Sequence, residues 1–568
     1  MNIIRPTVIT DAMLQSSNIP ETDYAEWLVG TTYADGNNVI VAAEHKIYES
    51  LQNGNVGHTP STSPTWWLDT GATNRWKIFD AKVQAQSSQA TEMNWVLNPG
   101  LIDSISLLNL DALSSQIIMA DQATNVILNG TAWTAATGVT PPTSWDLVGT
   151  PSAFLIDAGA LKITSDAAGE GISQTMAVTA GDELQLLGIY KNTAGDFCQI
   201  KIEAWNLITN GGMEAGDPPT GWMAYGTPET FERSAVEKYS GSYSAHVVDS
   251  TPSFGGFRTI STSLFTVGKT YKFSFRYYIV SGGINAGNDA EWSKNFTTTG
   301  SWEFGEFTGV ITSPGSYFMV RNISNSIAAE YYIDDVSVSE IILAETDLVS
   351  TTVFSTISQV FTVPADCTSV KISLLAKANG DIVWFDTISL SEVVYNETTT
   401  LLNTIAVIDW YTYFFEPIVR ATDMVKTDLA AIGVPPITTA SVTVIVTYAG
   451  GTAKCGEVVM GLKFELGAMR WSPTIGIIDY SIKEADAFGN YSITERAYSK
   501  RMSCELMIKN TVVDEVIRQL TLYRATPTVY VGSEDYSGLI IYGFYKSFEV
   551  VMPYPNFSEC NIEIEGLT

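Results

Sequence analysis

Few side chains in this chain have the types and spacing that catalysis requires. The histidines, His45, His58 and His246, are far apart, and none belongs to a metal-binding or catalytic-triad pattern. Glycoside hydrolysis needs only two carboxylates that are close in space, so acidic residues remain candidates for such a pair. Conceivable members are Glu203, Glu303 and Glu306. We expect no catalytic residues, and a polysaccharide depolymerase is the alternative.

The composition is that of a large, acidic, β-rich protein. The chain has 568 residues, enough for several domains, and its 44 glycines and 16% charged residues suit short strands joined by polar turns. The formal net charge of −30 comes from 31 basic and 61 acidic residues. Because phosphate contacts need clustered lysine and arginine, we expect no nucleic-acid partner.

No segment predicts export or membrane insertion. Residues 1–20 lack the basic and apolar segments of a signal peptide, and no apolar run reaches the roughly 18 residues that span a bilayer. The cysteines are odd in number and without metal-binding spacing, so we expect buried thiols made in a reducing cytosol. They are Cys198, Cys367, Cys455, Cys504 and Cys560.

Two pairs of repeated motifs show an unusual order. Residues 141–145 read PPTSW and residues 218–222 read PPTGW, whereas IDDVSVSE at 333–340 matches FDTISLSE at 385–392. Both opening motifs precede both closing motifs, so one repeat lies inside the other. This order predicts an outer module of 126–205 plus 341–394 that holds an inner module of 206–340.

The inner module has further motifs in a characteristic order. NLITNGGME at 206–214 leads to the PPTGW motif, then to GSYSA at 241–245, YKFSFRY at 271–277 and YIDDV at 332–336. This order resembles the jelly-roll carbohydrate-binding modules attached to xylanases and other glycanases. The resemblance implies that flat aromatic side chains stack on a sugar ring. The candidates are Trp222, Tyr225, Phe257, Trp292 and Trp302, with Trp222 alternatively a fold signature because Trp145 is its copy.

The same resemblance implies a structural calcium ion near the ends of the inner module. Glu214 and Asp335 match the family's positions, and hard carboxylate oxygens suit calcium. Ordinary turn carboxylates are the alternative. The outer module has Thr387 in place of Asp335, so we do not expect a metal there.

Residues 21–70 form a small aromatic unit. Its order of Trp27, Tyr33, Tyr48 and the Trp66–Trp67 pair, with interleaved glycines, resembles the chitin-binding module of bacterial chitinases and cellulases. Binders of that family have an aromatic pair after the second tyrosine, but residues 49–54 read ESLQNG here. A structural or protein-docking role is therefore expected, with glycan binding as the alternative. Adjacent tryptophans in a strand face opposite ways, so one should be buried and the other exposed.

The remaining segments, 1–20, 71–125 and 395–568, are predicted to form one β-rich frame. A single helix is expected from Val512 to Tyr523, with Thr511 as its N-cap. Its apolar face is predicted to consist of Val513, Val516, Ile517 and Leu520. IRPTVITDAM at 4–13, YGFYKSF at 542–548 and NIEIEGL at 561–567 resemble tail-tip proteins of long-tailed bacteriophages.

These expectations combine into one prediction. The protein is mainly β and multi-domain, with β-sandwich (jelly-roll) modules inserted into a β-rich frame that has one C-terminal helix. The resemblances imply a virion protein of a phage tail tip or baseplate, assembled in the host cytoplasm, that forms a ring and contacts other tail proteins. The modules would bind host-surface glycans, or the protein would be an assembly scaffold whose modules bind nothing. The basic turn at 496–501 would contact neighbours or be a solvated charged turn.

Overall fold

The computed structural model describes the whole chain except residues 131–132, 134–136, 139, 205–207, 209, 252, 261–264, 289–292, 314–316, 349–350, 365–366, 368, 403–409, 411–413, 415–425, 486–487 and 489, and the side chains of 137 and 342–347. The fold is mainly β, as predicted, and divides into two compact units. Unit 1 comprises Met1–Thr124 and Val393–Thr568, and unit 2 comprises Asn125–Glu392. Among the described residues no helix is long and apolar enough to cross a membrane.

Unit 1 is built on two antiparallel sheets whose strands come from both ends of the chain. The order in the larger sheet is β29-β7-β31-β1-β37-β38-β39-β36-β32, with β33 also paired to β36. These strands are β1 (Asn2–Pro6), β7 (Ser104–Leu108), β29 (Leu429–Ile432), β31 (Glu457–Glu465), β32 (Ala468–Met469), β33 (Thr474–Asp479), β36 (Tyr498–Lys509), β37 (Thr528–Val531), β38 (Ile540–Val551) and β39 (Phe557–Gly566). The second sheet has β2 (Leu14–Ser17), β6 (Ser87–Leu97), β30 (Ala440–Cys455) and β8 (Ser114–Asp121), in that order.

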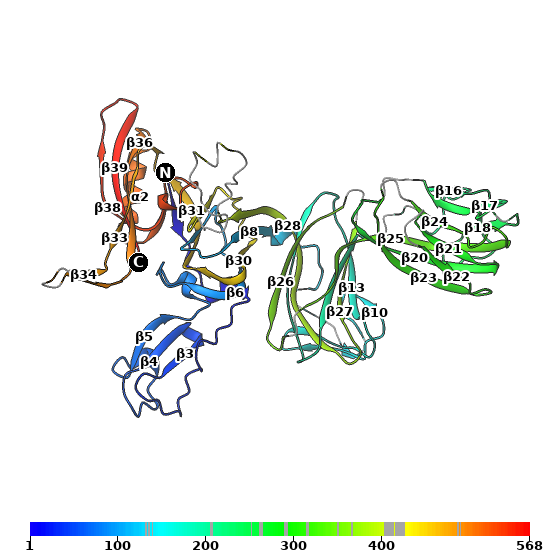
Figure 1. Cartoon of the computed structure of the whole chain (residues 1–568), viewed down its shortest axis with the longest axis horizontal. Helices are drawn as coiled ribbons and strands as arrows, with labels where there is room; N and C mark the ends of the chain where they lie inside the picture. The colour runs from blue at the N-terminus through cyan, green and yellow to red at the C-terminus, as the bar shows by residue number, and fades with distance from the viewer. Residues whose placement is uncertain are drawn as a thin grey trace. The chain divides into compact units, whose positions relative to one another are not determined.

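Two small sheets complete unit 1. The module of residues 21–72 has β3 (Asn38–Val41), β4 (Lys46–Ser50) and β5 (Trp67–Ala72). The other is the hairpin of β34 (Ile482–Ala485) and β35 (Tyr491–Thr494), which Figure 1 shows extending away from β33.

The predicted C-terminal helix is confirmed as α2 (Val513–Leu522). Val513, Val516 and Leu520 are buried in a core with strands β36 and β39, because helical spacing puts them on one face. The predicted N-cap was wrong: Val512 precedes the helix and no side chain caps it. Asp514 in the first turn, with the carboxylate next to it, favours the positive end of the helix dipole instead.

Unit 2 contains two β-sandwiches with separate cores (Figure 1). The outer sandwich has one sheet in the order β9-β11-β12-β28-β14-β26 and another in the order β10-β13-β27-β15. Its strands are β9 (Thr137–Gly138), β10 (Asp146–Val148), β11 (Ala153–Asp157), β12 (Ala160–Thr164), β13 (Glu170–Ala177), β14 (Glu183–Asn192), β15 (Cys198–Ala204), β26 (Ser355–Thr362), β27 (Ser369–Ala376) and β28 (Ile382–Thr400).

The inner sandwich lies in the chain between β15 and β26. One sheet has the order β17-β18-β25-β20-β23 and the other β16-β19-β24-β21-β22. Its strands are β16 (Trp222–Tyr225), β17 (Thr230–Ser234), β18 (Ser244–Asp249), β19 (Gly256–Thr259), β20 (Thr270–Ser281), β21 (Ile284–Asn288), β22 (Ser293–Phe296), β23 (Trp302–Val310), β24 (Phe318–Asn322) and β25 (Ala329–Asp347). The end of β25 also pairs with β15 of the outer sandwich.

The repeated motifs have the same local geometry in both sandwiches. Asp335 and Thr387 have positive φ angles of 47° and 48°, and the backbone N–H of each donates to Oδ1 of the preceding aspartate at 2.8 Å. The indole N–H of Trp222 donates to the carbonyl oxygen of Asn210 at 3.2 Å, whereas that of Trp145 donates to Leu128 at 3.1 Å. The motifs therefore specify equivalent turns and equivalent buried tryptophans.

Candidate functional site

The structure separates the aromatic residues that the sequence grouped into one sugar site. Trp222 and Phe257 lie in the core of the inner sandwich, 3% and 0% exposed, with ring centroids 5.2 Å apart. Their prediction as sugar-stacking residues is corrected here, because inward-facing strand positions pack the two sheets together and leave no ring face for a ligand. Trp222 is a structural residue, like its copy Trp145.

Two further aromatic candidates remain, Trp292 and Tyr225. Trp292 lies outside the described residues. Tyr225 is half-buried on β16, in the sheet opposite to the one that carries Trp302, and its ring lies 6.1 Å from that of Tyr317. Of the predicted aromatic residues, Trp302 therefore anchors the candidate site on its own sheet.

Trp302 is the end of a row of side chains that crosses all five strands of that sheet. Register pairs Glu232 of β17 with His246 of β18, His246 with Tyr332 of β25, Tyr332 with Tyr278 of β20, and Tyr278 with Trp302 of β23. We call these five residues the inner row. Adjacent strands lie about 4.8 Å apart, so four steps span roughly 19 Å.

The inner row faces away from the core because its neighbours in each strand face inward. Phe275 and Tyr277 of β20 and Tyr331 and Ile333 of β25 are buried in the inner core. Side chains alternate along a strand, so Tyr278 and Tyr332 point to the opposite face.

The rings of the inner row are in contact with one another. His246 stacks on Tyr332 at 4.4 Å with an interplanar angle of 12°, and Tyr278 lies 6.3 Å from Tyr332 and 5.9 Å from Trp302. Tyr239 extends the aromatic surface, because its ring, 47% exposed, lies 5.9 Å from Trp302. The result is a continuous row of rings, the aromatic platform, in which His246, Tyr278 and Trp302 are half-buried and Tyr239 is exposed. Tyr332 at its centre is 5% exposed, so it supports the neighbouring rings and offers little ring surface of its own.

Charged groups border this platform. His246 lies between two carboxylates, with Nδ1 3.2 Å from Glu232 and Nε2 3.2 Å from Glu330. At the other end, the Arg276 guanidinium lies 4.3 Å from the centroid of the Tyr239 ring. Burial, followed by the neighbouring Glu330, raises the pKa of Tyr332, so its phenol stays protonated at neutral pH. Flat apolar rings with hydrogen-bonding groups at the edges are suited to binding a carbohydrate chain.

Sequence reasoning missed most of this platform. Tyr278 had a usable signal, because the alternation in residues 270–281 puts it on the face opposite to Phe275 and Tyr277. His246 and Tyr332 had none, because their pairing joins β18 to β25, and the two residues are 86 positions apart in the sequence.

The predicted calcium residues lie close together at one end of the inner sandwich. Glu214 Oε1 accepts backbone N–H groups of Ser242 and Tyr243 at 2.7 and 3.1 Å, and Asp335 Oδ1 accepts the Ser240 hydroxyl at 2.6 Å. In the part of the chain that the structure describes, no group of three or more His, Cys, Asp or Glu side chains is arranged to hold a metal ion. A calcium ion would therefore also need backbone or water oxygens, and it stays a proposal.

The three acidic residues that could form a hydrolytic pair do not come together. Glu203 is 3% exposed and lies 3.2 Å from the Lys201 ammonium in the outer sandwich. Glu303 and Glu306 are both on β23, but an odd separation in a regular strand directs them to opposite faces.

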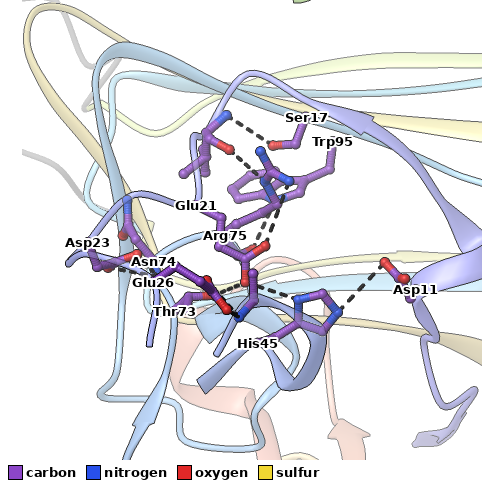
Figure 2. A network of polar contacts seen from close by, with 12 residues as sticks. Asp11, Ser17, Glu21, Asp23, Glu26, His45, Thr73, Asn74, Arg75 and Trp95 are labelled. Carbon is purple, nitrogen blue, oxygen red and sulfur yellow. Dashed lines mark hydrogen bonds and ion pairs between the residues drawn. The ribbon is translucent and has the colours of Figure 1, made fainter. Parts of the chain in front are cut away.

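The small module of residues 21–72 is packed and tied to the rest of unit 1. Trp67 is buried at 2% exposure, which confirms that one tryptophan of the pair is a core residue. Trp66 is half-buried and not exposed, because it packs against the same core and its ring stacks on His58 at 4.0 Å. Figure 2 shows the polar network at its base, where Glu21 Oε1 accepts the Thr73 hydroxyl at 2.6 Å and lies 3.0 Å from His45 Nδ1. This network holds the ends of the module together.

No known family model matches this chain, and no curated protein matches it. The CBM22-1 xylan-binding domain of Paenibacillus barcinonensis Xyn10C is 16% identical over 30% of this chain and 100% of that domain, with a TM-score of 0.21. Family 16 Carbohydrate Binding Module-2 is 17% identical over 23% of this chain and 99% of that chain, with a TM-score of 0.18. The enzymatically active domain of bacteriophage CBA120 tailspike protein 4 is 16% identical over 24% of this chain and 21% of that chain, with a TM-score of 0.20. At these values the likeness carries no argument about function.

Proposed function

We propose that this protein is a structural virion protein of a phage tail tip or baseplate that binds a host-surface glycan on the inner row. The observation that supports glycan binding is the aromatic platform from His246 to Trp302. Pyranose rings present apolar faces that stack on such rings, and their hydroxyls suit the Glu232 and Arg276 groups at the edges.

A glycan array probed with the full-length protein tests this function. We expect saturable binding to at least one neutral oligosaccharide, such as a β-1,4-linked xylohexaose. Trp302→Ala and Tyr278→Ala should each weaken binding at least tenfold, which corresponds to about 1.4 kcal/mol. Tyr225→Ala is the matched control on the opposite sheet and should leave binding unchanged. If both platform variants bind as the wild type does, the inner row is not the site.

Assembly into a ring with other tail proteins is the second part of the proposal. It is supported by the arm, which we define as β33 to β35, residues 474–494. Ile477, Tyr491 and Ile493 on the arm are 60%, 71% and 66% exposed. The two-stranded hairpin of β34 and β35 would be marginally stable alone in water, and exposed apolar side chains on it suit an interaction site. We propose that the arm packs on a second copy of this chain, in a virion assembled in the host cytoplasm.

A depolymerase remains the alternative of a different class. Incubating purified protein with host polysaccharide and measuring released reducing ends distinguishes the two functions. If the protein only binds glycans, no reducing ends are released above a blank. Reducing-end release that persists in the Trp302→Ala variant would favour the depolymerase instead. A scaffold with non-binding modules is supported instead if the array shows no ligand but the protein still assembles.

A further inference from the structure

The outer sandwich carries a second row at the place that corresponds to the inner row. Aligning the closing motifs at 333–340 and 385–392 matches Tyr332 with Trp384. Register then pairs Leu155 of β11 with Lys162 of β12, Lys162 with Trp384 of β28, and Trp384 with Lys191 of β14. Phe354 lies beside Lys191 and immediately precedes β26. We call these five residues the outer row.

The outer row faces away from the core of its sandwich. Phe154, Leu161, Tyr190 and Val383 are buried in that core, and each is the neighbour in sequence of a row residue. By the same alternation that exposes the inner row, the row residues lie on the outer face, where Trp384 and both lysines are half-buried and Phe354 is exposed.

Two ammonium groups flank one indole in the outer row. Lys162 Nζ lies 5.1 Å and Lys191 Nζ 4.7 Å from the centroid of the Trp384 ring, and Lys191 Nζ is also 4.5 Å from the Phe354 centroid. Asp157 fixes the indole, because its Oδ2 accepts the ring N–H at 2.8 Å. Among the described residues, neither lysine forms an ion pair with a carboxylate, although the chain has 61 acidic residues and 31 basic ones.

The two rows differ in charge. The inner row ends in Glu232, and Glu330 lies against its histidine, so that end repels an anion. The outer row has Leu155 and Lys162 at the matching positions. Two unpaired cations beside aromatic rings form a site for an anionic group that is attached to an apolar ring face.

We propose that the outer row binds a carbohydrate that carries an anionic substituent: a uronate, sulfate or phosphate. The anionic group lies between the ammonium groups of Lys162 and Lys191, and the sugar ring packs on Trp384 and Phe354. The ligand class of this site goes beyond the neutral glycan proposed for the inner row. If the lysine stems only cover the tryptophan, as amphipathic side chains often do, the site binds nothing.

The test uses the full-length protein with Trp302→Ala, which weakens binding at the inner row and so separates the two proposals. An array of uronate-, sulfate- and phosphate-bearing oligosaccharides identifies the anionic group, and calorimetry then measures the best probe at low and high salt. If tetragalacturonate is that probe, its methyl ester is the neutral comparison. We expect binding that weakens with salt, because exposed charges are screened, and that is at least tenfold weaker for the neutral ester.

Charge-removing variants locate the site. Lys162→Gln with Lys191→Gln should weaken binding at least tenfold, whereas Lys377→Gln should not, although Lys377 also lies over a ring, that of Phe197 at 5.1 Å. Thermal unfolding confirms that each variant folds. The proposal is overturned if no anionic probe on the array binds, or if the double variant binds as tightly as its parent.

Discussion

A buried carboxyl group in unit 1 gives a prediction whose size follows from the structure. Glu457 at the start of β31 is 4% exposed, and its Oε2 has no hydrogen-bond partner within the described structure. Burial, and secondarily the charge of Asp80, raises the pKa of Glu457 from 4.5 to about 9, against the N–H of Ala81, which lowers it. The folded protein therefore keeps this carboxyl protonated at neutral pH.

The sign of the pH dependence follows from this shift. Below pH 4.5 the group is protonated in the folded and the unfolded chain, and its contribution to stability is fully present. Between pH 4.5 and about 9 only the unfolded chain loses the proton, so the free energy of unfolding falls as pH rises. At about 1.4 kcal/mol per pH unit, the loss is roughly 1 kcal/mol at pH 5.5 and roughly 4 kcal/mol at pH 7.5.

Glu457→Gln removes the ionisation while keeping the shape of the side chain. We expect the variant to gain about 3 kcal/mol more over the wild type at pH 7.5 than at pH 5.5. Urea denaturation of wild type and variant at both pH values measures this difference. Hydrogen exchange of peptides from β31 then shows whether the change is local to that strand. Glu549→Gln, an exposed position on β38, is the control and should change stability equally at both pH values. An equal gain for Glu457→Gln at both pH values would refute the reasoning.

Three further predictions concern the module, the metal and the arm. Glu21→Ala should lower the free energy of unfolding of the small module by about 1–3 kcal/mol, because Thr73 and His45 lose a half-buried acceptor, and hydrogen exchange in β3 to β5 should accelerate. Calcium at 100 times its dissociation constant should stabilise the inner sandwich by about 2.7 kcal/mol, and Glu214→Gln should reduce that shift in a thermal melt, whereas a melt that calcium and chelator leave unchanged argues against the ion. Tyr491→Ser with Ile493→Ser should lower the sedimentation coefficient if the arm joins copies, and an unchanged value argues against it.

The fold class could be predicted because its signals are local. Alternation in residues 270–281 and the helical spacing of Val513, Val516 and Leu520 each depend on a short stretch of sequence. The N-cap prediction failed because a plausible residue type at Thr511 does not decide where the first turn begins, and the helix starts one residue later than expected, at Val513.

The candidate site could be predicted only in part, because it depends on register. Trp302 was among the predicted sugar-stacking residues, but its partners come from four other strands, and pairing joins Tyr278 to both Trp302 and Tyr332. Trp222 and Phe257 were wrongly predicted to stack on sugar, because an aromatic residue in a strand indicates a buried position as readily as an exposed one. The outer row was missed for the same reason: Lys162 and Lys191 are unremarkable until pairing puts them on either side of Trp384.

The most direct test of the central claim is a structure of this protein in complex with the best neutral glycan from the array. The account predicts sugar rings stacked along the inner row, on Tyr278 and Trp302, with hydroxyls bonded to groups at its edges. A glycan bound on the opposite sheet near Tyr225, with the inner row empty, would contradict it.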